Sequence, residues 1–172
     1  MARIGVTGHM NITADTVPSV YDGIRKVLAR QGDPDDLVGG SCIARGADSV
    51  FARAVLDAGG RLEVVLPSTN YRQRKVKPDH AELFDELIAH ADTVRVMDFD
   101  DAGPEAYEAA NKAVLSSCDR LVAVWDGEAG SAGGTGTWSS WRAPVTCRWR
   151  SFGRMEPSAS EVNPTASISV SS

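Results

Sequence analysis

The residues best suited to chemistry lie between Gly39 and Asp48, where the sequence is G-G-S-C-I-A-R-G-A-D. An apolar pair precedes this stretch, and residues 49–56 after it have helical spacing. A strand, a glycine-rich turn and a helix in this order point backbone N–H groups at an anion, and the helix dipole adds roughly half a positive charge. Arg45 stands in the turn, where its planar guanidinium could hold phosphate or carboxylate. The alternative interpretation is an ordinary strand–helix connection with a solvated arginine.

Two further turns follow apolar strand patterns. Thr7-Gly8-His9 comes after the first, and a second glycine-rich loop, residues 130–136, comes after residues 121–125. We expect Gly39, Gly40 and Gly46 to take positive φ values, which let the backbone approach a ligand closely. The carboxyl ends of parallel strands meet at one edge of a sheet, so the three turns should converge there. Their convergence predicts a pocket for a small anion or a nucleotide.

Strand and helix patterns alternate along the chain. Apolar, β-branched runs predict strands, and apolar residues at steps of three and four predict helices. The predicted strands are 3–7, 37–38, 62–66, 93–97 and 121–125, and helices are predicted over 17–30, over 49–58, and from Pro78 and Pro104. The fold class is therefore α/β, a Rossmann-like doubly wound parallel sheet of five or more strands with helices on both faces. The alternating strand 93–97 should lie nearer an edge, and the continuously apolar strand 121–125 should lie centrally.

Between the third strand and the next helix, residues 68–77 form a polar segment with five Tyr, Arg and Lys side chains. This basic cluster is either a solvated face or a lid that contacts phosphate.

The composition of the 172-residue chain limits its partners and location. A net charge of −5 makes nucleic acid an unlikely main partner, and no apolar run is long enough to span a membrane. Three cysteines without paired spacing indicate a reducing compartment, and the chain start lacks a signal-peptide pattern, so we expect a cytoplasmic protein. The histidines and cysteines show no metal-ligand spacing, so no metal site is expected.

The pattern breaks after Gly136. Residues 137–172 hold two acidic and four basic side chains against 21 and 14 before them, so the net charge reverses from −7 to +2. We therefore expect a Rossmann-like domain over 1–136 and an irregular, disordered or out-of-frame tail over 137–172. Back-translated with GC-rich codons and read one base earlier, residues 136–155 become an amphipathic helix and a buried strand, so we hypothesise a frameshift. Such a tail would leave the outer edge of the last strand uncovered and favour oligomerisation.

Three segments of residues 1–136 resemble the SLOG superfamily, which joins the DNA-processing Smf proteins to the "Lonely guy" phosphoribohydrolases, often labelled lysine-decarboxylase-like. Gly5-Val6-Thr7-Gly8-His9 is similar to the first-strand signature. Ala44-Arg45-Gly46-Ala47-Asp48, followed by Leu62 to Pro67 and Tyr71, is similar to the Smf-type block. Trp125-Asp126-Gly127 with Gly133-Gly134-Thr135-Gly136 resembles the closing G-G-T loop.

The resemblance implies a Rossmann-like domain that binds nucleotides or nucleotide-derived ligands, commonly as an oligomer and without a further cofactor. By position it implies that Thr7, Gly8 and His9 line the pocket, that Gly40, Ser41, Arg45 and Gly46 hold phosphate or ribose, and that Gly133, Gly134 and Thr135 form a second phosphate cradle. Asp48 would either orient Arg45 or simply occupy the first turn of a helix.

Three functions remain open from the sequence. The first is a module that binds a nucleotide or nucleotide-derived small molecule. The second is an enzyme, a nucleotide N-glycosidase or phosphoribohydrolase that releases free base. It needs a carboxylate near the ribose, and in the closing loop only Asp126 and Glu128 qualify, so no catalytic residue is assigned. The third is a DNA-binding protein of the Smf type, which the negative net charge disfavours.

Overall fold

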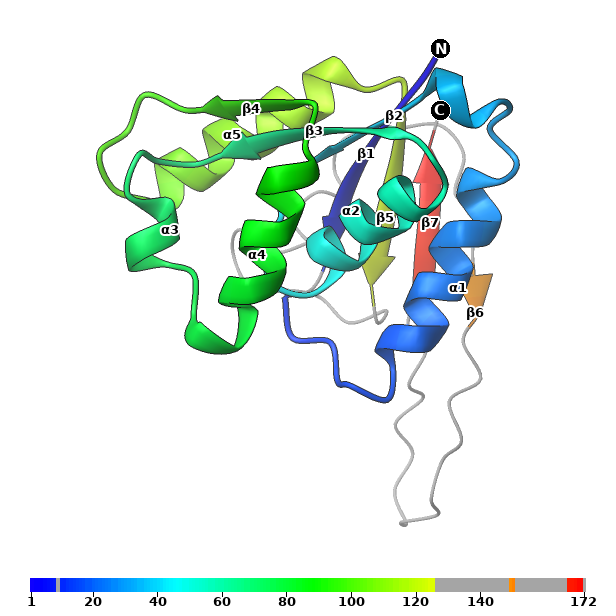
Figure 1. Cartoon of the computed structure of the whole chain (residues 1–172), viewed down its shortest axis with the longest axis horizontal. Helices are drawn as coiled ribbons and strands as arrows, with labels where there is room; N and C mark the ends of the chain where they lie inside the picture. Colours follow the sequence, from blue (N-terminus) through cyan, green and yellow to red (C-terminus); the bar gives the residue numbers. More distant parts are fainter. Residues whose placement is uncertain (9, 126–148, 151–166, 172) are drawn as a thin grey trace.

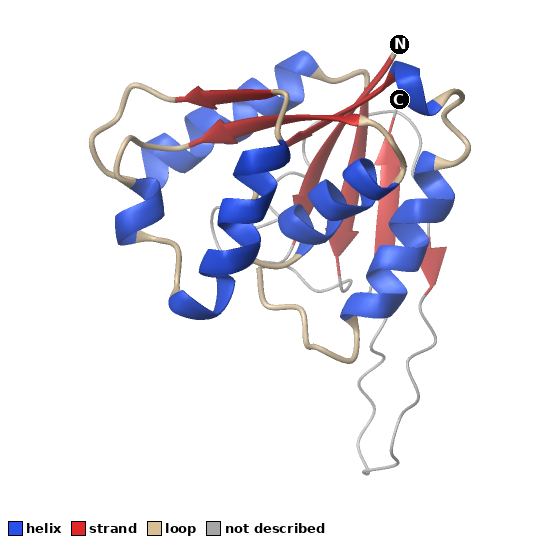
Figure 2. Cartoon of the chain, viewed as in Figure 1, coloured by secondary structure: helices blue, strands red, loops and turns tan. Residues whose placement is uncertain are grey.

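The computed structural model describes residues 1–8, 10–125, 149–150 and 167–171 (Figure 1). Five strands alternate with helices as the sequence predicted, and proline opens α1, α4 and α5 (Figure 2). The strands are β1 (Ala2–Gly8), β2 (Leu37–Ser41), β3 (Arg61–Leu66), β4 (Thr93–Val96) and β5 (Arg120–Trp125). The helices are α1 (Val17–Leu28), α2 (Ala47–Asp57), the short α3 (Tyr71–Arg74), α4 (Pro78–His90) and α5 (Pro104–Ser117), with a 3-10 turn at Pro34–Asp36. None of these helices has the length and apolar character needed to cross a membrane.

The five strands form a parallel sheet in the order β4-β3-β2-β1-β5. This order confirms the predicted Rossmann-like class. It also confirms that β4 lies at an edge, where all four of its residues are exposed. The order reverses at β1, which pairs with β2 on one side and β5 on the other. Ligands of open α/β sheets bind at such a switch point, outside the carboxyl ends of the strands.

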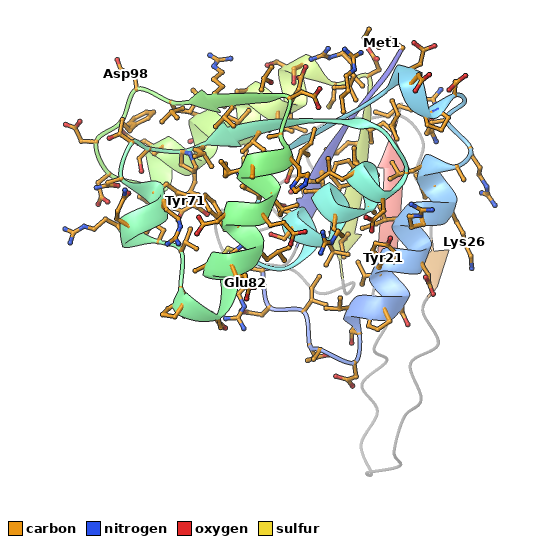
Figure 3. All side chains as sticks on the ribbon, viewed as in Figure 1. Met1, Tyr21, Lys26, Tyr71, Glu82 and Asp98 are labelled. Carbon is orange, nitrogen blue, oxygen red and sulfur yellow. The ribbon has the colours of Figure 1, made fainter. Side chains whose placement is uncertain are left out.

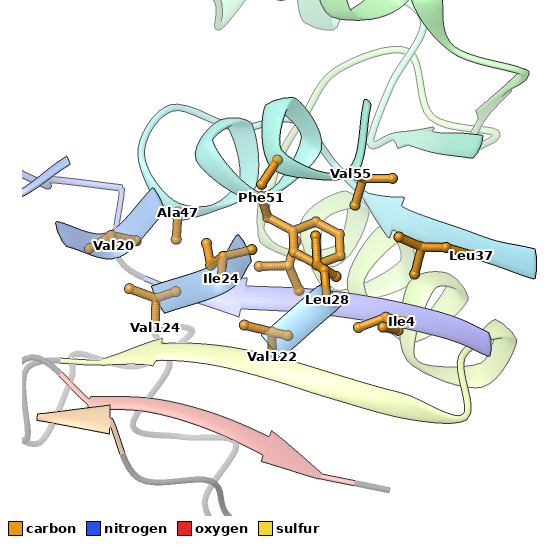
Figure 4. Packing of buried hydrophobic residues seen from close by; sticks show 12 residues of the cluster. Ile4, Val20, Ile24, Leu28, Leu37, Ala47, Phe51, Val55, Val122 and Val124 are labelled. Carbon is orange, nitrogen blue, oxygen red and sulfur yellow. The ribbon is translucent and has the colours of Figure 1, made fainter. Parts of the chain in front are cut away.

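Helices cover both faces of the sheet. Alternate strand side chains point to opposite faces, and those facing α1, α2 and α4 form the larger part of the core. Phe51 of α2 is fully buried in this part of the core, which it shares with Ile24 of α1 and Val122 of β5 (Figure 4). The opposite face carries α5, whose Ala110 and Val114 pack on β2 and β3.

Two glycines allow α2 to lie very close to the sheet. A Cβ atom on Gly39 would stand 2.5 Å from Cγ2 of Val55, and one on Gly8 would stand 2.6 Å from Cβ of Ala47. The expectation of a positive φ at Gly39 and Gly40 is wrong, because β2 continues through both residues and leaves them out of the turn. Gly46 does take a positive φ of 88°.

Two short strands follow the parallel sheet, β6 (Trp149–Arg150) and β7 (Ser167–Ser171), neither of them predicted. β7 pairs antiparallel with β5 from Leu121 to Trp125, so the expectation that the outer edge of β5 stays uncovered is wrong. The alternating pattern Ser-Ile-Ser-Val-Ser has the two-residue period of a strand, which explains the pairing. The expected domain boundary at residue 136 and residues 136–148 of the hypothesised frameshift lie outside the described residues.

A matched pair of substitutions in β2 tests the close approach of α2. Gly39→Ala should lower the free energy of unfolding by about 1–3 kcal/mol, because the new methyl group overlaps Val55. Gly40→Ala should change it little, because its methyl group would meet Val114 Cγ1 at an ordinary 3.5 Å. Urea denaturation measures both, and equal effects of the two substitutions would contradict this packing.

Candidate functional site

A sharply folded loop, residues 42–46, joins β2 to α2 at the carboxyl edge of the sheet. Two of its residues lie in the left-handed region of backbone conformation, Ile43 with φ 46° and Gly46 with φ 88°. Glycine adopts this conformation readily, but a β-branched residue such as Ile43 does so at a cost on the order of 1–3 kcal/mol. Ile43 is also fully buried. The surrounding structure must therefore hold this loop in place.

Two buried serines brace the loop from within. Ser41 Oγ accepts a hydrogen bond from the Ile43 backbone N–H at 3.0 Å and donates one to the Asp48 carbonyl at 3.1 Å. Ser49 Oγ donates to the Ala44 carbonyl at 2.7 Å. The hydroxyl of Ser41, which the resemblance assigned to phosphate or ribose, is thus already engaged in shaping the loop.

The loop presents the first turn of α2 to the end of β1. Among the described residues, no acceptor pairs with the backbone N–H groups of Ala47, Asp48 and Ser49, which are the groups that a helix leaves open at its N-terminus. The contact between Gly8 and Ala47 places this turn beside the carboxyl ends of β1 and β5. The structure therefore brings together Thr7, Gly8, Gly46 and the α2 N-terminus at the switch point.

Arg45 extends from the loop with half of its side chain exposed. Its Nη2 lies 3.0 Å from Oδ2 of Asp79, in the first turn of α4. The sequence left open whether Asp48 orients Arg45, and in the structure the ion-pair partner of Arg45 is Asp79. An ion pair between two half-exposed side chains contributes little to stability, so the guanidinium can exchange this carboxylate for another anion.

Asp48 occupies the first turn of α2 on the other side of the loop. Burial raises the pKa of its carboxyl group from 3.8 to about 7, and a hydrogen bond from the Ala44 backbone lowers it in part. Burial and the nearby charge of Asp48 also raise the pKa of the Cys42 thiol. The sequence places Asp48 in this turn but does not predict its raised pKa, because the surroundings of the carboxyl group come from the end of β2 and the segment after β3.

Tyr71 lies near this group and contacts a second tyrosine, Tyr107. The ring of Tyr71, the first residue of α3 and labelled in Figure 3, meets the ring of Tyr107 edge-on with centroids 6.1 Å apart. Burial raises the pKa of the Tyr71 hydroxyl, and so, to a smaller degree, do the charges of Tyr107 and Asp48. Tyr71, which the Smf-type block includes, is therefore a buried residue that ties α3 to α5.

The basic segment before α4 is partly engaged within the protein. Arg72 binds Asp85 through two hydrogen bonds of 2.6 Å and lies over the ring of Phe84. Arg74, Lys75 and Lys77 are exposed. The solvated and the phosphate-contacting interpretations therefore both remain open for these last three residues.

Several expected site residues cannot be placed. His9, Gly133, Gly134, Thr135 and the carboxylates of Asp126 and Glu128 lie outside the described residues. Gly40 is buried within β2 beneath Val114 of α5, so its backbone supports the sheet next to the loop. In the described part of the chain, no three His, Cys, Asp or Glu side chains are grouped as metal ligands.

A groove of about 320 Å³ lies over α2, between α1 and α4. Its lining is mostly apolar. Of its polar members, Arg53 pairs with Glu86, Ser49 braces the loop, and Asp22 carries a negative charge. The groove therefore has fewer groups available to bind an anion than the loop of residues 42–46 has. The lining consists of Val17, Pro18, Tyr21, Asp22, Ser49, Val50, Arg53 and Leu83.

Comparison with known proteins supports the fold. No protein-family model matches the chain, and neither does any curated protein sequence. Among solved structures, DNA processing protein A from Helicobacter pylori is similar to this chain. The alignment covers 77% of this chain and 58% of that protein, with 16% identity and a TM-score of 0.54, and the description of that structure concerns single-stranded DNA binding. This neighbour agrees with the SLOG resemblance of the sequence and shows that the Rossmann-like fold is shared.

Two more structures are similar. The alignment with DNA processing protein A from Streptococcus pneumoniae covers 69% of this chain and 39% of that protein, with 19% identity and a TM-score of 0.49. The alignment with TM1055 covers 77% of this chain and 64% of that protein, with 15% identity and a TM-score of 0.48. The matched region is thus less than two thirds of each of the three neighbours.

The raised pKa of Asp48 predicts how the free energy of unfolding depends on pH. Between pH 4 and 7 the folded protein holds a proton on Asp48 that the unfolded chain has lost, so this group's contribution to stability declines as the pH rises through that range. Asp48→Asn does not titrate and keeps an oxygen that can accept from Ala44. The melting temperature of the variant minus that of the wild type should therefore increase by about a few degrees from pH 5 to pH 8. A difference that stays constant over this range would contradict the assignment.

Proposed function

We propose that the loop of residues 42–46 and the N-terminus of α2 bind the phosphate of a nucleotide or nucleotide-derived small molecule. The observation that carries the proposal is that the N–H groups of Ala47, Asp48 and Ser49, which pair with no acceptor among the described residues, lie beside the exposed guanidinium of Arg45. Helix N-termini favour anions through these N–H groups and through the helix dipole. α2 has 11 residues, which is long enough to develop such a dipole.

The neighbouring residues would have different roles in this site. Thr7 and Gly8 would form the wall at the end of β1, and we propose that His9, the next residue in the sequence, also lines the pocket. Gly46 allows the turn that exposes the N–H groups, and Ser41 and Gly40 would support the loop from beneath. We propose Gly133, Gly134 and Thr135 as a second phosphate cradle after β5, as the resemblance implies.

Single-stranded DNA is a second candidate ligand. The exposed side chains of Arg74, Lys75 and Lys77 lie in the segment that leads into α4, whose first turn also holds Arg45 through Asp79. The Helicobacter pylori neighbour is described as a single-stranded DNA-binding protein. The net charge of −5 opposes this role, because binding to DNA depends on the release of counterions by cationic side chains.

The phosphoribohydrolase interpretation depends on a carboxylate near the ribose. Asp48 supports it, because a carboxyl group with a pKa of about 7 can donate a proton at neutral pH. Chromatographic detection of adenine released from AMP would support the enzyme, and its loss in Asp48→Asn would connect the activity to this residue.

Two arginines on α2 and its preceding loop provide a matched test of the binding site. Arg45→Ala should weaken AMP binding at least about tenfold, since a charge-assisted hydrogen bond contributes about 1.5–3 kcal/mol. Arg53→Ala should leave binding unchanged, because Arg53 pairs with Glu86 further along the helix. Isothermal titration calorimetry measures both affinities, after a thermal-shift screen of AMP, ADP-ribose, NAD and cyclic nucleotides.

Arg45→Ala and a double variant of the exposed lysines separate the two ligand classes. Equal AMP affinity in wild type and Arg45→Ala would contradict the phosphate site. Tight binding of an oligothymidylate that weakens steeply with salt and is lost on Lys75→Glu with Lys77→Glu would favour the DNA interpretation instead.

A further inference from the structure

The first turn of α4 holds the loop of residues 42–46 through two side chains. Asp79 pairs with Arg45, and the adjacent His80 is buried beneath the loop. Nε2 of His80 lies 3.2 Å from the Ile43 carbonyl oxygen and 3.2 Å from Ser49 Oγ. Neither contact was expected from the sequence, because His80 lies more than 30 residues after the loop.

The hydrogen-bond partners determine where the imidazole proton lies. Ser49 has one hydroxyl proton, and its 2.7 Å contact with the Ala44 carbonyl uses it. Toward His80, Ser49 Oγ can therefore only accept, as can the Ile43 carbonyl. Nε2 must carry a proton that is shared between these two oxygens.

The ring of His80 is itself fixed in orientation. It meets the ring of Phe84 edge-on, with centroids 6.3 Å apart and an interplanar angle of 71°. Phe84 is buried one turn further along α4 and belongs to the core between α2, α4 and β3. Because the core fixes the orientation of the imidazole, its Nε2 is held at a fixed position next to the Ile43 carbonyl oxygen.

We propose that His80 is a positioning residue, which holds Ile43 in its left-handed conformation and thereby sets the direction of Arg45 and the α2 N-terminus toward the ligand. This inference rests on the proposed function. The backbone of Ile43 determines the path of residues 44–46, because a change from the left-handed region would turn the following peptide groups away. Loss of the His80 hydrogen bond would then move Arg45 and the N–H groups of α2 out of the arrangement that binds an anion, while the sheet and helices remain folded.

Two substitutions of His80 test the proposal with AMP as the probe. His80→Leu removes the donor and should weaken AMP binding at least tenfold. His80→Gln places an amide N–H near the position of Nε2 and should stay within about threefold of the wild type. Urea denaturation establishes the conditions under which each variant is folded. A folded His80→Leu protein that binds AMP as tightly as the wild type would overturn the proposal.

A second measurement covers the case in which His80→Leu does not fold. The imidazole ¹⁵N spectrum of the wild type should show a slowly exchanging proton on Nε2 of His80, and His80→Gln identifies this signal among those of the three histidines. A His80 ring with its only proton on Nδ1 would overturn the proposal.

Failure of the proposed function gives a different result. If the wild type binds neither AMP nor inorganic phosphate, the proposed ligand is wrong. The rate of amide hydrogen exchange at residues 43–47 then tests the role of His80 independently. Faster exchange in folded His80→Leu than in the wild type and in His80→Gln, confined to these residues, would support positioning of the loop. Unchanged exchange there would overturn it.

Discussion

The structure depends on the close contact between α2 and the two strands beneath it. Gly8 and Gly39 have no Cβ atoms, and a methyl group at either position would lie within 2.7 Å of a side-chain carbon of α2. This contact buries Phe51 and Val55 in the main core and brings the first turn of α2 to the ends of β1 and β5. The same two glycines therefore serve packing and the geometry of the candidate site, and the site cannot be moved without reopening the core.

The loop before α2 combines strain with strong support. A buried isoleucine in the left-handed conformation is unfavourable by itself. Its N–H donates a hydrogen bond to Ser41 Oγ, and its carbonyl accepts one from Nε2 of His80. Strained backbone persists only where the neighbouring structure determines it, and such positions concentrate at ligand sites. Within the described part of the chain, the exposed Arg45 and the unpaired N–H groups at the start of α2 can meet a ligand, while the serine hydroxyls inside the loop are engaged.

The charges around the loop are arranged asymmetrically. Arg45 and its partner Asp79 lie in solvent on the α4 side, where an incoming anion can compete for the guanidinium. Asp48 lies on the side of Cys42, Tyr71 and Tyr107, and its raised pKa leaves it partly neutral near pH 7. A neutral Asp48 repels a phosphate less than a carboxylate would, so anion binding at the loop would be coupled to protonation at this residue.

The sequence by itself determined the order of the five parallel strands and their helices along the chain, the parallel α/β class and the edge position of β4. These features follow from local periodicity, from proline and glycine positions and from the rules that govern strand–helix–strand connections. Only the tertiary structure decided that Gly39 and Gly40 belong to β2, that Asp79 and not Asp48 holds Arg45, that His80 supports Ile43 and that β7 covers β5. Each of these depends on contacts between segments far apart in the chain, and side-chain types or spacing along one segment carry no information about such contacts.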